Sequence, residues 1–184
     1  MGQELPVTSY ALLGLLTFGD ELTGYELKQR ADRTLRYYWT APAMSQVYSE
    51  LGRLTRHGLV KAVTGGTSRR TTRYQITDEG RKTLRAWMDG TPAGFPVLKH
   101  PVALRLLIGH VLDPEGVAQL LRDYLDDLAR QRKDLTEVRE SLRGSDAPGD
   151  AFRYPSLVAD WGLAYYDAEE QITRDLLARI ESEG

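Results

Sequence analysis

Cysteine is absent from this chain of 184 residues. Without thiols, the sequence excludes disulfide scaffolds, cysteine-ligated zinc, CxxC redox motifs and thiol nucleophiles. The absence is compatible with a reducing compartment.

Long hydrophobic runs are also scarce. The longest apolar stretch near the N-terminus, residues 10–18, follows Glu4 rather than a basic segment. A membrane-spanning helix needs roughly 18 apolar residues, and a signal peptide begins with positive charge. We therefore expect a cytoplasmic protein that has no membrane partner.

Catalytic and metal-binding motifs are missing as well. His57, His100 and His110 have neither HExxH spacing nor cysteine companions, and Gly65-Gly66 lacks the remaining residues of a phosphate-binding loop. No nucleophile motif frames a Ser-His-Asp set. We predict no enzymatic activity, no cofactor and no metal ion.

Charge is distributed unevenly along the chain. The totals of 24 Lys and Arg against 26 Asp and Glu give a net charge of −2. Residues 1–90, however, carry 13 basic and 9 acidic side chains, a net of +4, and residues 91–184 carry 11 and 17, a net of −6. Only the first half can therefore face phosphates. Residues 51–77 hold six basic side chains and no acidic one: Arg53, Arg56, Lys61, Arg69, Arg70 and Arg73.

Capping signals predict two helices in the first 40 residues. We expect the first helix to begin near Thr8 and to stop at Gly19. Thr23 followed by Glu26 has the spacing of a capping box, which predicts a second helix over residues 24–36.

A third helix is expected over residues 43–57, and it is strongly amphipathic. At 100° per residue one face collects the side chains expected to pack: Met44, Val47, Tyr48, Leu51 and Leu54. The opposite face collects small and polar residues: Ser45, Gln46, Ser49, Gly52, Arg53 and Arg56.

A β-hairpin follows the third helix. Residues 59–64 and 71–77 have the composition and alternation of strands, and the turn between them carries Arg69 and Arg70. A fourth helix is expected over residues 78–90. Three helices followed by a two-stranded wing is the order of a winged helix-turn-helix domain, in which the third helix enters the major groove.

Residues 91–101 are rich in proline and glycine and read as a linker. A short helix over residues 102–110 and a long one from Asp113-Pro114 are expected next. The long helix has apolar side chains in heptad spacing, interrupted by Gln131: Val117, Leu121, Tyr124, Leu128, Leu135, Val138 and Leu142. This seam needs a partner helix, from the same chain or from a second one.

A final helix over residues 156–181 carries one apolar stripe: Trp161, Tyr165, Ala168, Ile172 and Leu176. The fold class is therefore mainly α. We expect an N-terminal winged helix-turn-helix domain over residues 1–90, a linker over 91–101, and a long-helix dimerisation domain over 102–184 whose two long helices form an antiparallel hairpin.

Several short segments resemble the PadR family of transcriptional regulators. They are residues 23–27 (TGYEL), residues 47–51 (VYSEL) with Leu54, residues 58–60 (GLV), and residues 74–81 (YQITDEGR). The order and spacing of these segments match the family closely over about residues 10–90. The long C-terminal helices match the subgroup with a larger helical dimerisation domain.

The resemblance implies a homodimer that binds palindromic promoter DNA, usually as a repressor, and that a small-molecule effector releases in some members. No effector-binding residue can be named, because Trp39, Trp87 and Trp161 are better explained by packing. A winged helix that binds an acidic protein instead of DNA is the alternative.

The candidate DNA contacts lie on the third helix and the wing. Gln46 has an amide that can pair with adenine, and Ser45 and Ser49 can reach bases or phosphates. Arg53 and Arg56 are expected at phosphates. Tyr48 can either pack in the core or present its hydroxyl to a phosphate, and the wing candidates are Arg69, Arg70 and Arg73. The candidate dimerisation residues come from both long helices: Val117, Leu121, Tyr124, Leu128, Leu135, Trp161, Tyr165 and Ile172.

Overall fold

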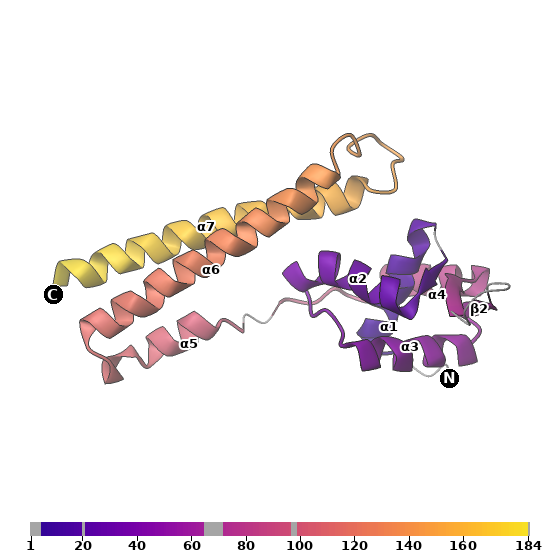
Figure 1. The fold of residues 1–184 in the computed structure, drawn as a ribbon, viewed down its shortest axis with the longest axis horizontal. Coiled ribbons are helices and arrows are strands. Elements are labelled where there is room, and N and C mark those ends of the chain that lie inside the picture. Colours follow the sequence, from indigo (N-terminus) through magenta and orange to yellow (C-terminus); the bar gives the residue numbers. More distant parts are fainter. Residues whose placement is uncertain (1–4, 20, 65–71, 97–98, 184) are drawn as a thin grey trace. The chain divides into compact units, whose positions relative to one another are not determined.

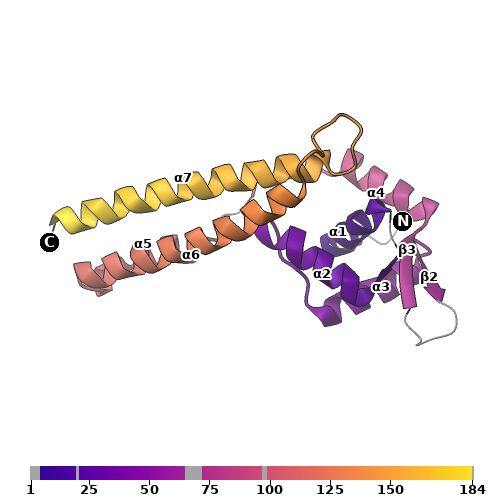
Figure 2. The same ribbon diagram turned by 45° about the horizontal axis from the view of Figure 1, so that its top comes forward.

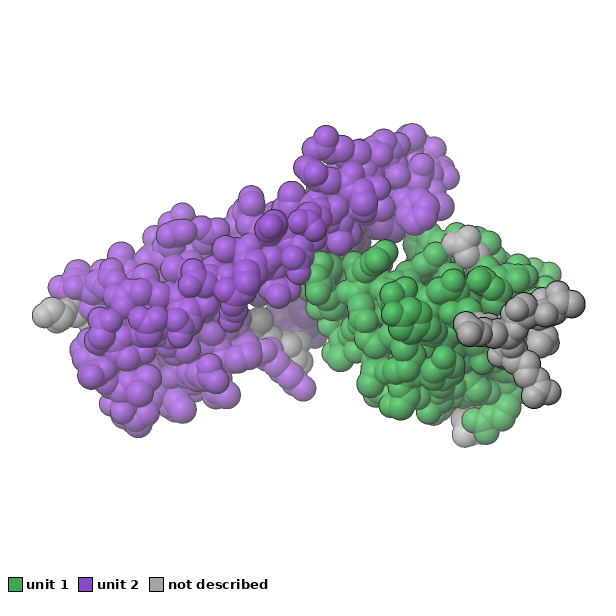
Figure 3. Space-filling view, in the orientation of Figure 1, with its two compact units in different colours: residues 1–94 green, residues 95–184 purple. Residues whose placement is uncertain are grey.

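The computed structural model describes residues 5–19, 21–64, 72–96 and 99–183. The chain forms two compact units, residues 1–94 and residues 95–184 (Figure 3). Each unit has its own secondary structure and its own packing.

The first unit contains four α-helices, a small sheet and two short 3-10 turns (Figure 1). Its elements are α1 (Val7–Leu15), η1 (Leu16–Phe18), β1 (Leu22–Thr23), α2 (Gly24–Thr34), η2 (Leu35–Tyr37), α3 (Met44–Arg56), β2 (Val60–Thr64), β3 (Thr72–Ile76) and α4 (Asp78–Gly90). Leucines from the first three helices fill the core. Leu12 and Leu13 of α1, Leu27 of α2, and Leu51 and Leu54 of α3 are completely buried.

The wing is an antiparallel pair of strands, as the alternating sequence predicts. β2 and β3 lie side by side (Figure 2), with Val60 opposite Ile76. The structure adds β1, a strand of two residues that pairs with the other edge of β3 and gives the order β1-β3-β2. A strand this short has no readable period, so the sequence analysis missed it.

Local capping signals agree with several of the helix starts. Glu26 N–H donates to Thr23 Oγ1 at 3.1 Å and Thr23 N–H donates to Glu26 Oε2 at 2.8 Å, which confirms the predicted capping box. The predicted start of α1 near Thr8 is confirmed to within one residue, since the helix begins at Val7, but the expected hydroxyl cap is absent and Pro6 precedes the helix instead. Proline has a fixed backbone angle that suits the entrance of a helix.

The second unit is a helical hairpin with a short helix beside it. It consists of α5 (Pro101–Leu107), η3 (Gly109–Val111), α6 (Pro114–Ser141) and α7 (Arg153–Glu183). α6 and α7 run antiparallel along their lengths in both ribbon views (Figures 1 and 2), which confirms the expected hairpin. The single helix expected over residues 102–110 is divided, since Ile108 leaves the helical conformation after α5.

The α6 seam is satisfied within the chain. Leu121, Leu128 and Leu135 are 1%, 4% and 1% exposed. The residues of α7 that are buried in the hairpin are small: Ser156, Ala159, Gly162 and Thr173. Small side chains let two helix backbones approach closely, so this face of α7 receives the leucines of α6. The more apolar stripe of α7 is left on the outside.

Candidate nucleic-acid interface

α3 presents a polar face to solvent and an apolar face to the core. Val47, Leu51 and Leu54 are fully buried, as expected from the helical period. Ser45, Gln46, Ser49, Gly52 and Arg56 are exposed. These small and polar side chains form the DNA-facing candidate surface on α3.

Gln46 is engaged in the free structure. Its Oε1 accepts a hydrogen bond of 2.9 Å from the backbone N–H of Ala43, at the first turn of α3. Bidentate pairing with adenine uses both the oxygen and the nitrogen of the amide. Gln46 would therefore have to give up this hydrogen bond to read adenine in that way.

Tyr48 packs one side of its ring against the chain and remains half exposed. Its ring rests against Gly24 at the start of α2, where an added Cβ would lie 2.5 Å from Tyr48 Cε1. The side chain nevertheless remains half exposed, at 51%. Glycine at position 24 is thus required by the close approach of the tyrosine ring.

The two α3 arginines have partners of their own chain. Arg56 Nε donates to the carbonyl of Gly52 at 3.4 Å, and Arg53 Nε lies 3.4 Å from Glu50 Oε2. Glu50 in turn accepts a hydrogen bond from the hydroxyl of Ser9 on α1. Glu50 and Ser9 were missed in the sequence, although Glu50 stands out as the single acidic residue between Arg33 and Thr77.

Of the three wing arginines, the structure describes Arg73. Arg69 and Arg70 lie outside the described residues. Arg73 donates to the carbonyl oxygen of Glu21 at 2.5 Å, and it lies 3.5 Å from Glu26 Oε1. The hydrogen bond from the backbone of Thr23, aided by the Arg73 charge, lowers the pKa of Glu26 below its usual value. The guanidinium of Arg73 is therefore directed toward β1 and α2.

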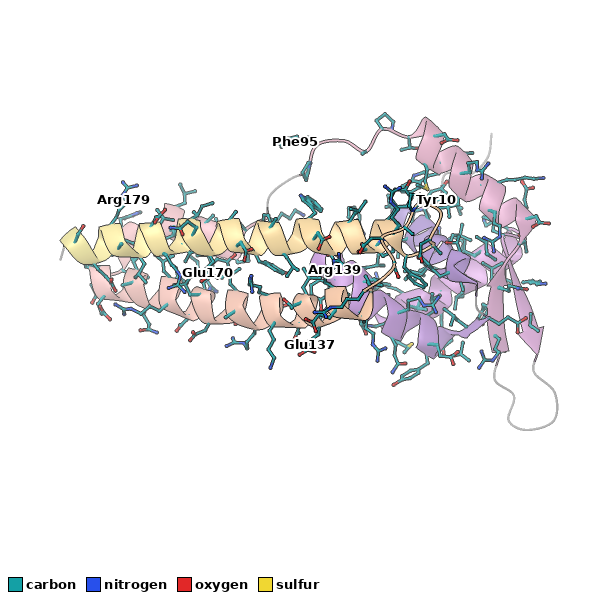
Figure 4. All side chains as sticks on the ribbon, turned by 90° about the horizontal axis from the view of Figure 1, so that it is seen from above. Tyr10, Phe95, Glu137, Arg139, Glu170 and Arg179 are labelled. Atoms are coloured by element: carbon teal, nitrogen blue, oxygen red, sulfur yellow. The ribbon has the colours of Figure 1, made fainter. Side chains whose placement is uncertain are left out.

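The second unit exposes apolar side chains at helical spacing. On α7 they form the outer stripe, which we define as Leu157, Val158, Trp161, Tyr165 and Ile172; Trp161 is 66% exposed. On α5 and the turn after it they are Leu104, Leu107, Ile108, Val111 and Leu112. Phe95, 93% exposed, projects from the connecting segment (Figure 4). Apolar side chains gathered in this way mark an interaction surface.

The sequence-predicted dimerisation residues fall into two groups. Trp161, Tyr165 and Ile172 belong to the outer stripe. The α6 residues contact the same chain instead: Val117 is partly buried, and Leu121, Leu128 and Leu135 are buried.

Tyr124, the remaining α6 candidate, joins three helices. Its hydroxyl donates to Glu169 Oε1 of α7 at 3.2 Å and lies 3.0 Å from Nε2 of His100, whose Nδ1 accepts from Ala103 N–H at the start of α5. Burial, and then the charge of Glu169, raise the pKa of Tyr124 well above its usual value. The same two causes raise the pKa of Tyr165.

Exposed ion pairs connect α6 to α7 along the hairpin. Arg122 lies 2.7 Å from Glu181, Arg132 lies 2.6 Å from Asp167, and Arg139 lies 2.6 Å from Asp160. Arg139 is near the turn that joins the two helices (Figure 4). These pairs bring together residues far apart in sequence and so specify the register of the hairpin.

Neither a metal site nor a membrane span is found in the described part of the chain. No three His, Asp or Glu side chains there come together as metal ligands would. Among the described helices, none has both the length and the apolar character needed to cross a bilayer.

A small leucine core, three helices with an exposed polar third helix, and a β-wing together define a winged helix-turn-helix regulator.

Comparison with known proteins gives the family. The model of the transcriptional regulator PadR-like family matches residues 12–86, and that of the virulence activator alpha C-terminal region matches residues 98–181. The negative transcriptional regulator PadR of Bacillus subtilis strain 168 is 30% identical over 144 residues, 77% of this chain and 78% of that protein. The chain belongs to the PadR-like family of transcriptional regulators, which are not enzymes.

Solved structures agree with this assignment. The crystal structure of Bacillus subtilis PadR in complex with operator DNA is 25% identical, with a TM-score of 0.82 over 95% of this chain and 99% of that one. The structure of the same protein in complex with p-coumaric acid is 26% identical, with a TM-score of 0.77 over 96% of this chain and 99% of that one.

Proposed function

We propose that this regulator is a homodimeric repressor that binds palindromic promoter DNA through the polar face of α3 and the basic wing. The observation that carries the proposal is the exposed polar face of α3 on a fold similar to that of an operator-bound relative. The relative's description as a negative regulator supports repression. The proposed DNA contacts are Ser45, Gln46, Tyr48, Ser49, Arg53, Arg56, Arg69, Arg70 and Arg73.

The proposed dimer uses the second unit. The proposed contact surface for a second copy is the outer stripe of α7, because its apolar side chains are exposed whereas the α6 leucines are covered by α7. Leu121, Leu128 and Leu135 then support dimerisation by holding α7 in place, and Val117 and Tyr124 flank them. We propose residues 1–90 as the DNA-binding domain, 91–101 as the linker and 102–184 as the dimerisation domain. Two-fold symmetry places half-sites about 34 Å apart, or a multiple of that distance.

A small-molecule effector is the third part of the proposal. It is supported by the relative solved with p-coumaric acid. A ligand that favours the free protein over the DNA complex weakens DNA binding by its difference in affinity for the two states. Titration of p-coumaric acid into the preformed complex tests this part: release of DNA supports it, and unchanged binding excludes this acid as the effector.

The DNA-binding proposal is tested by selecting bound duplexes from a random DNA pool. The chain should enrich an inverted repeat, and a variant with Arg53, Arg69 and Arg70 changed to Ala should lose the enrichment, because phosphate contacts supply much of the affinity. The matched control changes three arginines of the second unit, Arg143, Arg174 and Arg179, and should still enrich the repeat. Failure of the folded wild-type dimer to enrich any sequence at low salt would instead favour a protein-binding winged helix.

A further inference from the structure

Glu50 places a negative charge on the helix that is proposed to enter the DNA. It is the single acidic residue between Arg33 and Thr77, a region otherwise supplied with basic side chains. A carboxylate near phosphate opposes binding, so this position calls for a structural explanation.

The carboxylate lies at the boundary between α3 and α1. The side chain of Glu50 is only 11% exposed. Its Oε2 accepts a hydrogen bond from the hydroxyl of Ser9, a residue of α1 that is fully buried. A buried carboxylate is tolerated when donors satisfy it, and removing one donor is costly. The Ser9–Glu50 pair therefore fixes how α3 is rotated against α1.

The same oxygen of Glu50 faces Arg53. The distance from Arg53 Nε to Glu50 Oε2 is 3.4 Å, which is an ion pair without the geometry of a hydrogen bond. This Nε is shielded from solvent, whereas the arginine side chain as a whole is 40% exposed. A guanidinium is a rigid plane, so contact at Nε constrains the direction of its two terminal nitrogens. Those nitrogens are the pair that binds a phosphate in bidentate fashion.

We propose that Glu50 is a positioning residue for DNA recognition: with Ser9 it sets the rotation of α3, and through Nε it orients Arg53 toward the DNA. This inference rests on the proposed function. An arginine that is oriented before binding loses less side-chain freedom when it meets its phosphate. The favourable orientation outweighs the repulsion from the added negative charge.

A purely electrostatic role and a positioning role predict opposite results for Glu50→Gln. Glutamine keeps the shape of the side chain but removes the charge. If Glu50 acts only as a charge, the variant binds all DNA more tightly. If Glu50 positions α3 and Arg53, the variant loses about tenfold in affinity for the selected duplex, because the rotation of α3 and the phosphate contact of Arg53 are both disturbed.

The experiment compares the full-length chain and its variants on the duplex selected from the random pool and on a scrambled duplex of equal composition. Glu79→Gln is the matched control, because Glu79 also pairs with a basic residue three positions later, Lys82, but on exposed α4. This control should bind the selected and the scrambled duplex with the same affinities as the wild type. In an Arg53→Ala background, Glu50→Gln should lose most of its effect, since the positioned group is gone.

An affinity of Glu50→Gln for the selected duplex that equals or exceeds that of the wild type overturns the inference and leaves the proposed function intact. If the wild-type chain binds the selected and the scrambled duplex with equal affinity, both the inference and the proposed function are overturned. If Glu50→Gln fails to fold, Ser9→Ala, Arg53→Ala and their double variant give the same test. Non-additive losses of affinity for the selected duplex support the coupling from Ser9 to Arg53, and additive losses overturn it.

Discussion

The two units of this regulator bury their apolar residues in different ways. In the first unit leucines of α1, α2 and α3 converge, and Leu12, Leu27 and Leu51 have no exposed surface. In the second unit the fully buried residues of α7 are small, with larger side chains such as Leu163 and Tyr166 only partly buried, whereas its outer stripe carries Trp161 and Ile172, which are 66% and 54% exposed.

This difference shows that the first unit buries its core within one chain, and it supports the proposal that a second chain covers the outer stripe of the second unit. The stability of the first unit should then be a property of the monomer. The stability of the second should depend on protein concentration, because association of the folded form shifts its unfolding equilibrium.

The largest expected loss of stability follows from opening the core of the first unit. Leu51→Ala removes a fully buried side chain and should lower the free energy of unfolding by about 2–5 kcal/mol. Chemical denaturation, followed by a probe in the first unit, measures the change at two protein concentrations. An equal loss at both agrees with a self-contained core, and a loss that varies with concentration contradicts it. Met88→Ala, at a position 68% exposed, serves as the control.

The next largest effect should come from the outer stripe. Trp161→Arg places a charge where the dimer buries an aromatic side chain, and should weaken association by about 2 kcal/mol or more. Sedimentation velocity measures the change as a shift from dimer to monomer. Gln171→Arg, about 80° from Trp161 around α7, should leave the dimer intact. A Trp161→Arg variant that remains dimeric would remove the outer stripe from the interface.

A smaller effect is expected at the start of α2, where the first unit is held by local hydrogen bonds. The pKa of Glu26 is lower in the folded chain than its ordinary value of 4.5. Its charged form therefore stabilises the fold above that value, and the stabilisation is lost as the pH falls through the folded pKa. Glu26→Gln should lower the melting temperature at pH 7 and have little effect at the acid end. An equal difference across thermal unfolding curves from pH 7 to pH 3 would contradict this.

The smallest effect should come from the exposed ion pairs of the hairpin. The side chains of Arg132 and Asp167 are 45% and 55% exposed, so Arg132→Ala should cost less than about 1 kcal/mol. The cost should decrease further in high salt. Thermal unfolding at low and high salt measures it. A large loss that does not depend on salt would show that the arginine contributes by packing instead.

Local signals account for what the sequence predicted well. The Thr23–Glu26 capping box and the cap at Asp113 act within one turn of a helix, so residue spacing alone identifies them. The heptad of α6 likewise predicted a partner helix. The polar face of α3 was predicted from the helical spacing of its residues, and the observed fold leaves that face exposed to solvent.

Contacts between distant residues account for what was missed. Ser9 and Glu50 are 41 positions apart, and neither belongs to a recognisable motif. The sequence also could not decide which face of α7 packs on α6. Hydrophobicity favoured the stripe with Trp161, but close helix approach selected the face with Ala159 and Gly162.

The most direct test of the dimeric DNA-binding account is the mass of the protein–DNA complex. Sedimentation equilibrium of the full chain with the selected duplex should give two chains for each duplex that contains both half-sites. Trp161→Arg should bind the same duplex much more weakly under identical conditions. One chain per duplex, bound as tightly by the variant as by the wild type, would contradict the account.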